Sequence, residues 1–183
     1  MHAAVGAIAE SGPATWSLRE LARRAGVSHA APAHHFGDKT GLLTAVAAEG
    51  YTLFADALER AGDDFYDLGL AYVRFAVDHR AHFEVMFRPE LYRTDDPEVD
   101  AARRRANEIL RRGVRSVAPG AATGETGARD QEDDRTAAIA AWCIVHGFAE
   151  LWLSGAFGGG LGDGLGDDPV AAASPVIRHL FAR

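Results

Sequence analysis

The sequence is poor in the residues and segments that mark disulfide-linked, secreted and membrane-spanning proteins. Its 183 residues include a single cysteine, Cys143, which excludes an internal disulfide framework and favours a reducing compartment. It has no charged-then-apolar leader and no uninterrupted apolar run of about twenty residues. We therefore expect a cytoplasmic protein that is neither secreted nor embedded in a membrane.

The sequence also lacks the motifs of the common enzyme classes. It contains no nucleophile elbow, no phosphate-binding glycine loop and no complete set of metal ligands. Cys143, His146 and Glu150 have a spacing that a small hydrolase or a metal enzyme could use, but no further ligands lie near them. The adjacent His34 and His35 would point about 100° apart on a helix and cannot readily share one ion. We expect no enzyme activity, no cofactor and no metal. The rival hypothesis is a small hydrolase or metal enzyme that uses Cys143, His146 and Glu150.

Most of the chain also lacks a net positive charge. The net charge is −7. Residues 1–47 nevertheless hold four cationic residues against three acidic ones, so the acidic excess lies in the remainder. The cationic residues of this segment are Arg19, Arg23, Arg24 and Lys39. An acidic body with a slightly basic head suits a protein that contacts phosphate only with its head.

What the N-terminal quarter does contain is a pattern of short helices joined by tight turns. A short apolar helix is expected over residues 2–11, and Gly12-Pro13 ends it. Ser17 is a suitable N-cap for the next helix, and Glu20, three residues later, completes a capping box. Gly26 can adopt the left-handed conformation that ends this second helix.

A third helix and a long fourth one follow this turn. Ser28 can cap a helix that carries His29 to Phe36, and Asp38 can cap the long helix that begins at Lys39. A helix, a glycine turn and a helix of this length predict a helix-turn-helix. The second helix of such a unit can enter the major groove of DNA.

This stretch resembles the DNA-binding unit of the TetR family of bacterial transcriptional regulators. The residues that carry the resemblance are Leu21 to Ser28 (LARRAGVS), His34-His35-Phe36, Asp38-Lys39 and Leu42-Leu43. The resemblance implies an all-α fold, with a three-helix DNA-binding domain over residues 1–47 and a helical ligand-binding and dimerisation domain over residues 48–183. It also implies a homodimer that binds a palindromic double-stranded operator and responds to a small-molecule effector.

The resemblance assigns the DNA contacts to the turn and the third helix. We expect Lys39 to contact a phosphate, and we expect the third helix to offer histidine donors and alanine methyl groups to the groove. The predicted DNA-binding residues are Ser17, Ser28, His29, Ala30, Ala31, His34, His35 and Lys39. Two positions depart from the family pattern, since Pro32 stands where leucine is usual and Ala33 where a phosphate-binding tyrosine is usual. The longer first helix and the basic arm that usually precedes it are missing from this sequence, either genuinely or because its start was assigned late.

The remainder of the chain predicts further helices. They are expected over residues 63–88 with a break at His79-Arg80, over 97–117, over 135–157, and from Pro169 onwards. Residues 118–134 and 158–168 show no periodicity and are expected to form a surface loop and a flexible connector. The arginine-rich part of 97–117 is expected to be a solvated helix face, with a second nucleic-acid surface as the alternative.

Trp142, His146 and Gly147 resemble the Trp-His-Gly signature of one C-terminal domain type within the family. The surrounding helix is apolar on nearly all sides, so we expect one side to meet its own core and the other a second copy. Cys143 is then expected to be a buried thiol, and Gly147 a point of close helix approach. His146 and Glu150 are expected to form a hydrogen-bonded pair facing a ligand pocket, with a purely structural role for His146 as the alternative.

Two further sets of site residues follow from the aromatic density and from this helix. The predicted ligand contacts are Tyr51, Phe54, Phe83, Met86, Phe87, Trp142, His146 and Glu150. The predicted dimer contacts are Ile139, Phe148, Leu151, Val176, Ile177 and Leu180, on two helices that would form a four-helix bundle with a second copy.

The sequence thus predicts a ligand-responsive transcriptional regulator, a repressor released from its operator by a small apolar molecule. The alternative is a dimeric helical protein that binds a small molecule or a partner and has weak or no affinity for DNA. The departures at Pro32 and Ala33 favour this alternative.

Overall fold

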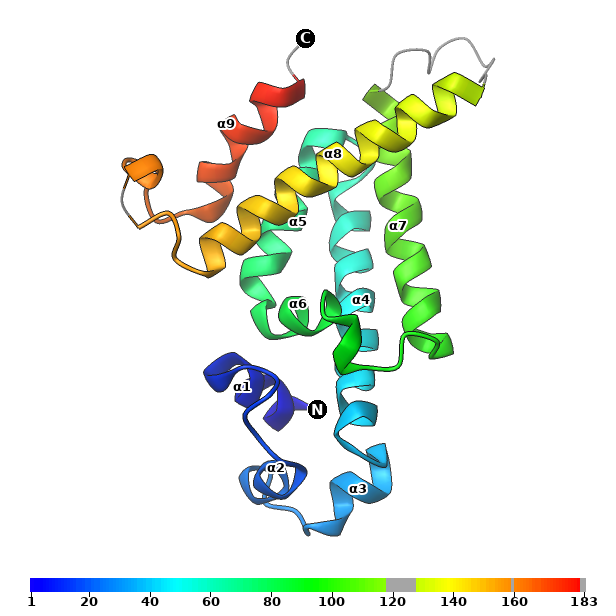
Figure 1. The fold of residues 1–183 in the computed structure, drawn as a ribbon, viewed down its shortest axis with the longest axis vertical. Helices are drawn as coiled ribbons and strands as arrows, with labels where there is room; N and C mark the ends of the chain where they lie inside the picture. Colours follow the sequence, from blue (N-terminus) through cyan, green and yellow to red (C-terminus); the bar gives the residue numbers. More distant parts are fainter. Residues whose placement is uncertain (118–127, 159, 182–183) are drawn as a thin grey trace. The chain divides into compact units, whose positions relative to one another are not determined.

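The structure is a computed structural model of the chain in which every regular element is a helix (Figure 1). It describes residues 1–117, 128–158 and 160–181, without the side chains of 116–117, 128–134, 161 and 180–181, and these residues contain no β-strand. The helices are α1 (His2–Ser11), α2 (Leu18–Arg24), α3 (Ala30–Phe36), α4 (Lys39–Ala61), α5 (Phe65–Asp78), α6 (Arg80–Met86), α7 (Pro97–Val117), α8 (Ala128–Leu153) and α9 (Pro169–Phe181), with 3₁₀ turns η1 (Pro89–Leu91) and η2 (Gly160–Gly162). The expected all-α fold class is therefore confirmed.

The chain forms two compact units, and neither is a continuous segment. Unit 1 consists of Met1–Leu53 and His79–Arg105, and unit 2 consists of Phe54–Asp78 and Ala106–Arg183. The long helices α4 and α7 each contribute one half to unit 1 and the other half to unit 2. The predicted domains, 1–47 for DNA binding and 48–183 for ligand binding and dimerisation, divide the chain by function rather than by packing. This division stays a prediction.

Unit 1 packs α1 against both α2 and α6, and α2 against α3. Its core includes Ile8, Leu42 and Phe83, each at most 2% exposed. Helices α4 and α6 come close at Gly50, where an added Cβ would lie 2.7 Å from the Met86 sulfur and 3.0 Å from the His82 Cβ. Only glycine fits this contact without a shift of α6.

Unit 2 is organised around α5, which packs against both α8 and α9. Leu68, Tyr72 and Val73 of α5 are almost completely buried. Phe54, from the α4 half that belongs to this unit, lies edge-on to Tyr72 at a ring distance of 5.1 Å. Aromatic and branched side chains thus fill the space between α5 and its neighbours, as expected for a core that is packed at high density.

Local chemistry explains most helix boundaries. The Ser17 hydroxyl accepts a hydrogen bond from the Glu20 amide, and the Asp38 carboxylate accepts one from the Gly41 amide, so both predicted caps are confirmed. Gly26 has the positive φ of 67° that the turn after α2 requires. Pro97 and Pro169 begin α7 and α9, as predicted.

Two local predictions are wrong. The Ser28 side chain does not cap α3, because this helix begins at Ala30 with His29 in the N-cap position and no side-chain cap. The predicted loop over residues 118–134 is also too long, because the backbone is helical from Ala128 onwards. Residues 118–127 lie outside the described part of the chain.

Replacing Gly50 by alanine should destabilise the protein, whereas the same change at Gly6 should stabilise it. The Gly50 methyl group would collide with Met86 and His82, which predicts a loss of about 1–2 kcal/mol in the free energy of unfolding. An added Cβ at Gly6, inside α1, meets nothing within 4 Å, so Gly6→Ala should gain about 0.4–1 kcal/mol. Urea unfolding followed by circular dichroism measures both changes, and equal shifts for the two variants would contradict the tight contact at Gly50.

Candidate functional site

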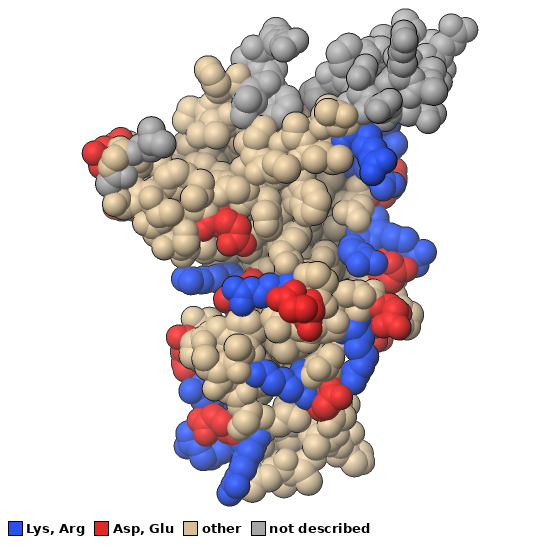
Figure 2. All heavy atoms as spheres, in the orientation of Figure 1, with Lys and Arg blue, Asp and Glu red and all other residues tan. Residues whose placement is uncertain are grey.

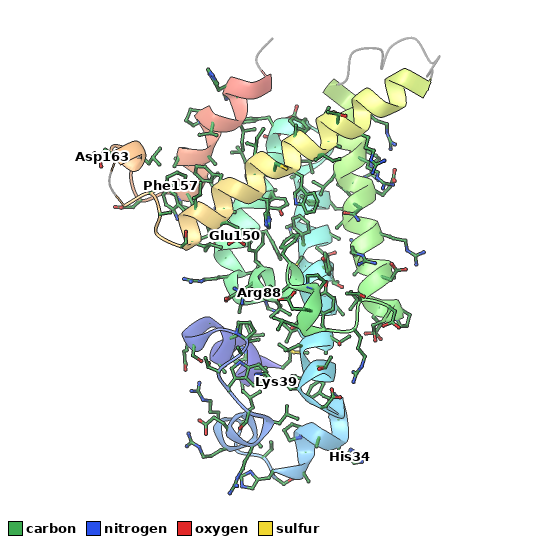
Figure 3. The ribbon with its side chains drawn as sticks, in the orientation of Figure 1. His34, Lys39, Arg88, Glu150, Phe157 and Asp163 are labelled. Carbon is green, nitrogen blue, oxygen red and sulfur yellow. The ribbon has the colours of Figure 1, made fainter. Side chains whose placement is uncertain are left out.

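The first candidate site is the exposed surface of α3 in unit 1. Helix α2 buries Leu21 and Ala22, which anchor it in the unit, whereas α3 has no buried residue. His34 and His35 are exposed, and Figure 3 shows His34 on the outer side of α3. None of the α3 side chains is buried in the core, so the outer face of this helix is available for a partner.

Every residue predicted to contact DNA lies on or beside this surface. Ser28 and His29 are exposed just before α3, Ala30 is exposed at its first position, and Ala31 is half-buried in its first turn. Ser17 is exposed at the start of α2. The structure brings these residues together in one unit, but their contacts with DNA stay a prediction.

Lys39 has an internal role that sequence reasoning missed. Its ammonium donates hydrogen bonds to the backbone oxygens of Ala14 and Trp16, at 2.9 and 3.0 Å, and lies 4.3 Å from the centre of the Trp16 ring. Partial burial lowers the pKa of this lysine. Lys39, which Figure 3 labels, thus ties the start of α4 to the loop between α1 and α2.

Acidic residues offset part of the positive charge around α2. Glu20 binds the guanidinium groups of Arg23 and Arg24, and these hydrogen bonds lower the pKa of its carboxyl to about 2. Arg24 also pairs with Glu10 of α1. The Glu20 side chain therefore binds arginine, although the sequence predicts that it returns to the N-cap. The basic character of the head is weaker than its residue count indicates.

The second candidate site is a cavity of about 610 Å³ in unit 2. Helices α5, α7, α8 and α9 contribute its walls. Most of the lining is apolar and comprises Phe65, Leu68, Gly69, Leu110, Val114, Ala138, Ile139, Ala141, Val145 and Ile177, with the rings of Tyr72 and Trp142. Its polar residues are Asn107, Arg111, Arg115 and Arg135. This volume falls in the range of about 300–1,000 Å³ that small-molecule sites occupy.

A chain of hydrogen bonds through Tyr72 joins α5 to α8 at this cavity. The Trp142 indole N–H donates to the Tyr72 hydroxyl at 3.1 Å, and the same hydroxyl lies 3.0 Å from His146 Nδ1. Since an indole can only donate, the Tyr72 proton is available for His146, which favours the histidine tautomer that carries hydrogen on Nε2. His146 Nε2 lies 4.0 Å from the Glu150 carboxylate. Burial lowers the pKa of His146, so the neutral ring is favoured.

Two known protein families match this chain. The family described as bacterial regulatory proteins of the tetR family matches residues 1–46. The family described as the tetracyclin repressor-like C-terminal domain matches residues 65–179, more than half of the chain. The chain belongs to the TetR family. Helix α3 is accordingly the second helix of a TetR-type helix-turn-helix, and unit 2 contains most of the TetR-type C-terminal domain.

Several solved structures resemble this chain along almost its whole length. A protein of unknown function from Rhodococcus sp. RHA1 is 33% identical, with a TM-score of 0.70 over 98% of this chain and 92% of that one. The TetR family transcriptional regulator PfmR from Thermus thermophilus is 19% identical, with a TM-score of 0.69 over 98% and 94% of the two chains. A bacterial regulatory protein in the tetR family from Rhodococcus RHA1 is also 19% identical, with a TM-score of 0.65 over 99% and 92%. The two likenesses at 19% identity show the fold alone, and no curated protein sequence matches the chain.

The predicted ligand contacts of this TetR-family protein are divided between the two units. Tyr51, Phe83, Met86 and Phe87 belong to unit 1 and do not line the cavity. The Tyr51 hydroxyl donates to the Met86 backbone oxygen at 3.0 Å, and Phe83 packs on Phe87 with ring centres 4.9 Å apart. These side chains form a core, whereas the cavity has other walls.

Of the predicted ligand contacts in unit 2, only Trp142 lines the cavity. Phe54 does not line the cavity and packs on the rings of Tyr72 and Phe75. His146 is connected to the cavity only through its hydrogen bond with the Tyr72 hydroxyl. Glu150 is exposed, and Figure 3 labels it on α8. Sequence reasoning missed Tyr72 and the arginines of the cavity. The alternation of Leu110 and Val114 with Arg111 and Arg115 on α7 was the available signal.

The predicted dimer contacts are divided between exposed and buried positions. Ile139, Leu151 and Val176 are exposed by 48%, 46% and 37%, respectively. Phe148 is buried against Trp152 and Phe157, and Ile177 is 2% exposed against Gly69, so both differ from the expectation of an interface position. The Leu180 side chain lies outside the described residues.

The exposed side of α8 differs from the sequence-based expectation at Cys143. Its thiol is exposed, so the prediction of a buried thiol is wrong.

In the described residues, no group of three His, Cys, Asp or Glu side chains is arranged to hold a metal ion. The segment Arg135–Leu153 is long and apolar enough to cross a membrane, but apolar helices of soluble proteins pass the same test.

The half-buried position of His146 predicts a pH-dependent contribution to stability. The pKa of His146 lies below its ordinary value of 6.5, so the unfolded chain binds a proton at a higher pH than the folded chain. The free energy of unfolding should therefore fall as the pH decreases through about 6.5 towards the folded pKa. His146→Gln keeps an acceptor for Tyr72 and removes this titration. Urea unfolding at about pH 7.5 and pH 5.5 should show a smaller loss in the variant than in the wild type. Equal losses would show that His146 does not change its pKa on folding.

Proposed function

We propose that this TetR-family protein is a homodimeric cytoplasmic repressor that leaves its DNA operator when a small apolar molecule binds in the cavity of unit 2. The observation that carries the proposal is the outer face of α3, which buries no side chain although α2 beside it is anchored by Leu21 and Ala22. A helix that packs on an anchored neighbour and buries no residue of its own is suited to enter a groove. The proposed regulator catalyses no reaction and needs no cofactor.

DNA recognition is proposed to combine weak base contacts with phosphate contacts. His34 and His35 can donate to phosphate oxygens or to a purine N7, and the methyl groups of Ala30 and Ala31 can contact thymine. In a two-fold dimer, the two copies of α3 would reach successive major grooves about 34–36 Å apart. A palindromic operator matches this symmetry.

The proposed dimer interface is the exposed apolar face of α8 and α9. Ile139 and Leu151 of α8 and Val176 of α9 are exposed, and Trp142 is 49% exposed on the side of α8 that carries Ile139. An added Cβ at Gly147 would meet nothing within 4 Å in the described chain, so a second helix can approach α8 there. Together with His146, Trp142 and Gly147 support a C-terminal domain of the Trp-His-Gly type. Two helices from each copy would then form a four-helix bundle.

Ligand control is proposed to work through one equilibrium between two conformations of the dimer. The operator favours one spacing of the two α3 helices, and the cavity ligand favours another. Each ligand then weakens the binding of the other, and a coupling free energy of about 1–3 kcal/mol is ordinary for such systems.

The alternative function is a dimeric protein that binds a small molecule or a partner and has lost operator binding. Ala33 is exposed at the position where the family resemblance implies a phosphate-binding tyrosine, and this supports the alternative. A gel shift with the DNA upstream of its own gene separates the two functions, because only the repressor should prefer that duplex over a scrambled one.

Two variants should distinguish base contacts from phosphate contacts in the same gel shift. Lys39→Met should weaken binding to specific and scrambled DNA alike and reduce the salt dependence by about one phosphate contact. His34→Ala should weaken binding mainly to the specific duplex, at a cost of about 1–3 kcal/mol. Urea unfolding of Lys39→Met is the control, because the loss of its bonds to Ala14 and Trp16 should also destabilise unit 1. If the salt dependence of DNA binding were unchanged in a folded Lys39→Met protein, Lys39 would not contact phosphate. Its role would then be limited to the hydrogen bonds with Ala14 and Trp16.

The proposed interface predicts that a charge on α8 converts the dimer to a monomer. Leu151→Glu would bury an unpaired carboxylate and should weaken dimerisation by about 3 kcal/mol or more. Val27→Glu is the matched control, since Val27 is also an exposed aliphatic residue but lies in unit 1. Sedimentation equilibrium measures both. A dimeric Leu151→Glu protein, or a wild-type monomer, would contradict the proposed interface.

A further inference from the structure

The cavity of unit 2 combines an apolar wall with positive charge. Its charged lining residues are Arg111 and Arg115 from α7 and Arg135 from α8, and the described lining includes no aspartate or glutamate. The rest of the lining contains Leu68, Val145 and other apolar side chains. All three arginines are exposed, so they place positive charge of one sign at the open rim of an apolar cavity.

These arginines differ in how far their charge is already neutralised. Arg115 pairs with Glu108 at 2.9 Å, and Arg112, one residue after Arg111, pairs with Asp63 at 3.2 Å. Among the side chains that the structure describes, which exclude those of residues 128–134, Arg111 and Arg135 have no acidic partner. Figure 2 shows Lys and Arg side chains gathered along α7, with acidic side chains between them. Arg111 and Arg135 therefore bring positive charge from two helices to one cavity.

The Tyr72 hydroxyl is not available to a ligand in the same way, because it already has both Trp142 and His146 as hydrogen-bond partners. A ligand that enters thus meets apolar side chains from α5, α8 and α9 and guanidinium groups from α7 and α8. A guanidinium binds a carboxylate or a phosphate through two parallel hydrogen bonds, which neutral head groups cannot match.

We propose that the cavity selects an apolar molecule with a single anionic head group, a carboxylate or a phosphate monoester, and that Arg111 and Arg135 bind this head group. The inference deepens the proposed function, because it names the chemical class of the effector. Arg111 and Arg135 are the specificity-determining residues, and the apolar wall around Leu68 and Val145 receives the body of the molecule.

Calorimetric titration of the full chain, without DNA, tests this class directly. Three ligands of one chain length serve as probes: decanoate, decyl phosphate and decan-1-ol, each below its micellar concentration. At least one of the two anions should bind about tenfold more tightly than the alcohol, as a charge-assisted hydrogen bond predicts. Preference for decanoate identifies a carboxylate as the head group, and preference for decyl phosphate identifies a phosphate monoester.

Variants of single arginines test which residues recognise the anion. Arg111→Gln and Arg135→Gln should each weaken the binding of the preferred anion about tenfold and leave the alcohol unchanged. Arg104→Gln is the matched control on α7, since Arg104 does not line the cavity and pairs with Asp100 on the surface. Circular dichroism verifies that each variant is folded.

Three results would overturn the inference: equal affinity for the anions and the alcohol, binding of none of the probes, or unchanged anion affinity in both cavity variants. The gel shift is separate from this titration. A protein that binds the anion but not the operator contradicts the proposed repressor and leaves the anion site standing. A protein that binds its operator but none of the probes contradicts the anion site alone.

Discussion

The buried hydroxyl group of Tyr72 is the constraint on which unit 2 depends. A hydroxyl that is removed from water without a partner costs about 1–3 kcal/mol, so its position is tolerable only where other polar groups meet it. Trp142 and His146 do so from one face of α8. These hydrogen bonds favour the rotation of α8 that turns Trp142 and His146 towards Tyr72. Leu151, half a turn away around α8, is exposed.

The fold could be predicted where local chemistry decides it. Ser17 and Asp38 cap their helices as expected, because a short polar side chain before a helix satisfies the first amides wherever it occurs. The start of α3 could not be predicted in this way. Pro32 has no amide hydrogen, and a start at Ala30 makes it the third helical residue, where no helical partner would be needed. Ser28 is then one residue too early to cap the helix.

The candidate sites divide along the same line. The α3 surface could be predicted from a continuous motif, but the walls of the cavity could not. Apolar periodicity marks a residue as buried, and it does not distinguish a filled core such as that around Phe83 from the rim of a cavity such as that at Ile139. The bond between Trp142 and Tyr72 joins residues 70 positions apart. Arg111 looks like any solvated arginine until α8 brings Arg135 to the same cavity.

The tryptophans of the chain give each unit an optical reporter of its own. Trp16 in unit 1 is buried beneath the Lys39 ammonium, whereas Trp142 in unit 2 is half exposed at the cavity. Indole fluorescence shifts to longer wavelength in polar surroundings, so the emission of the two rings differs in colour. Trp152, stacked near Phe148, adds a third contribution from unit 2. Changes around Trp16 in unit 1 and around Trp142 at the cavity can thus be followed by fluorescence in unlabelled protein.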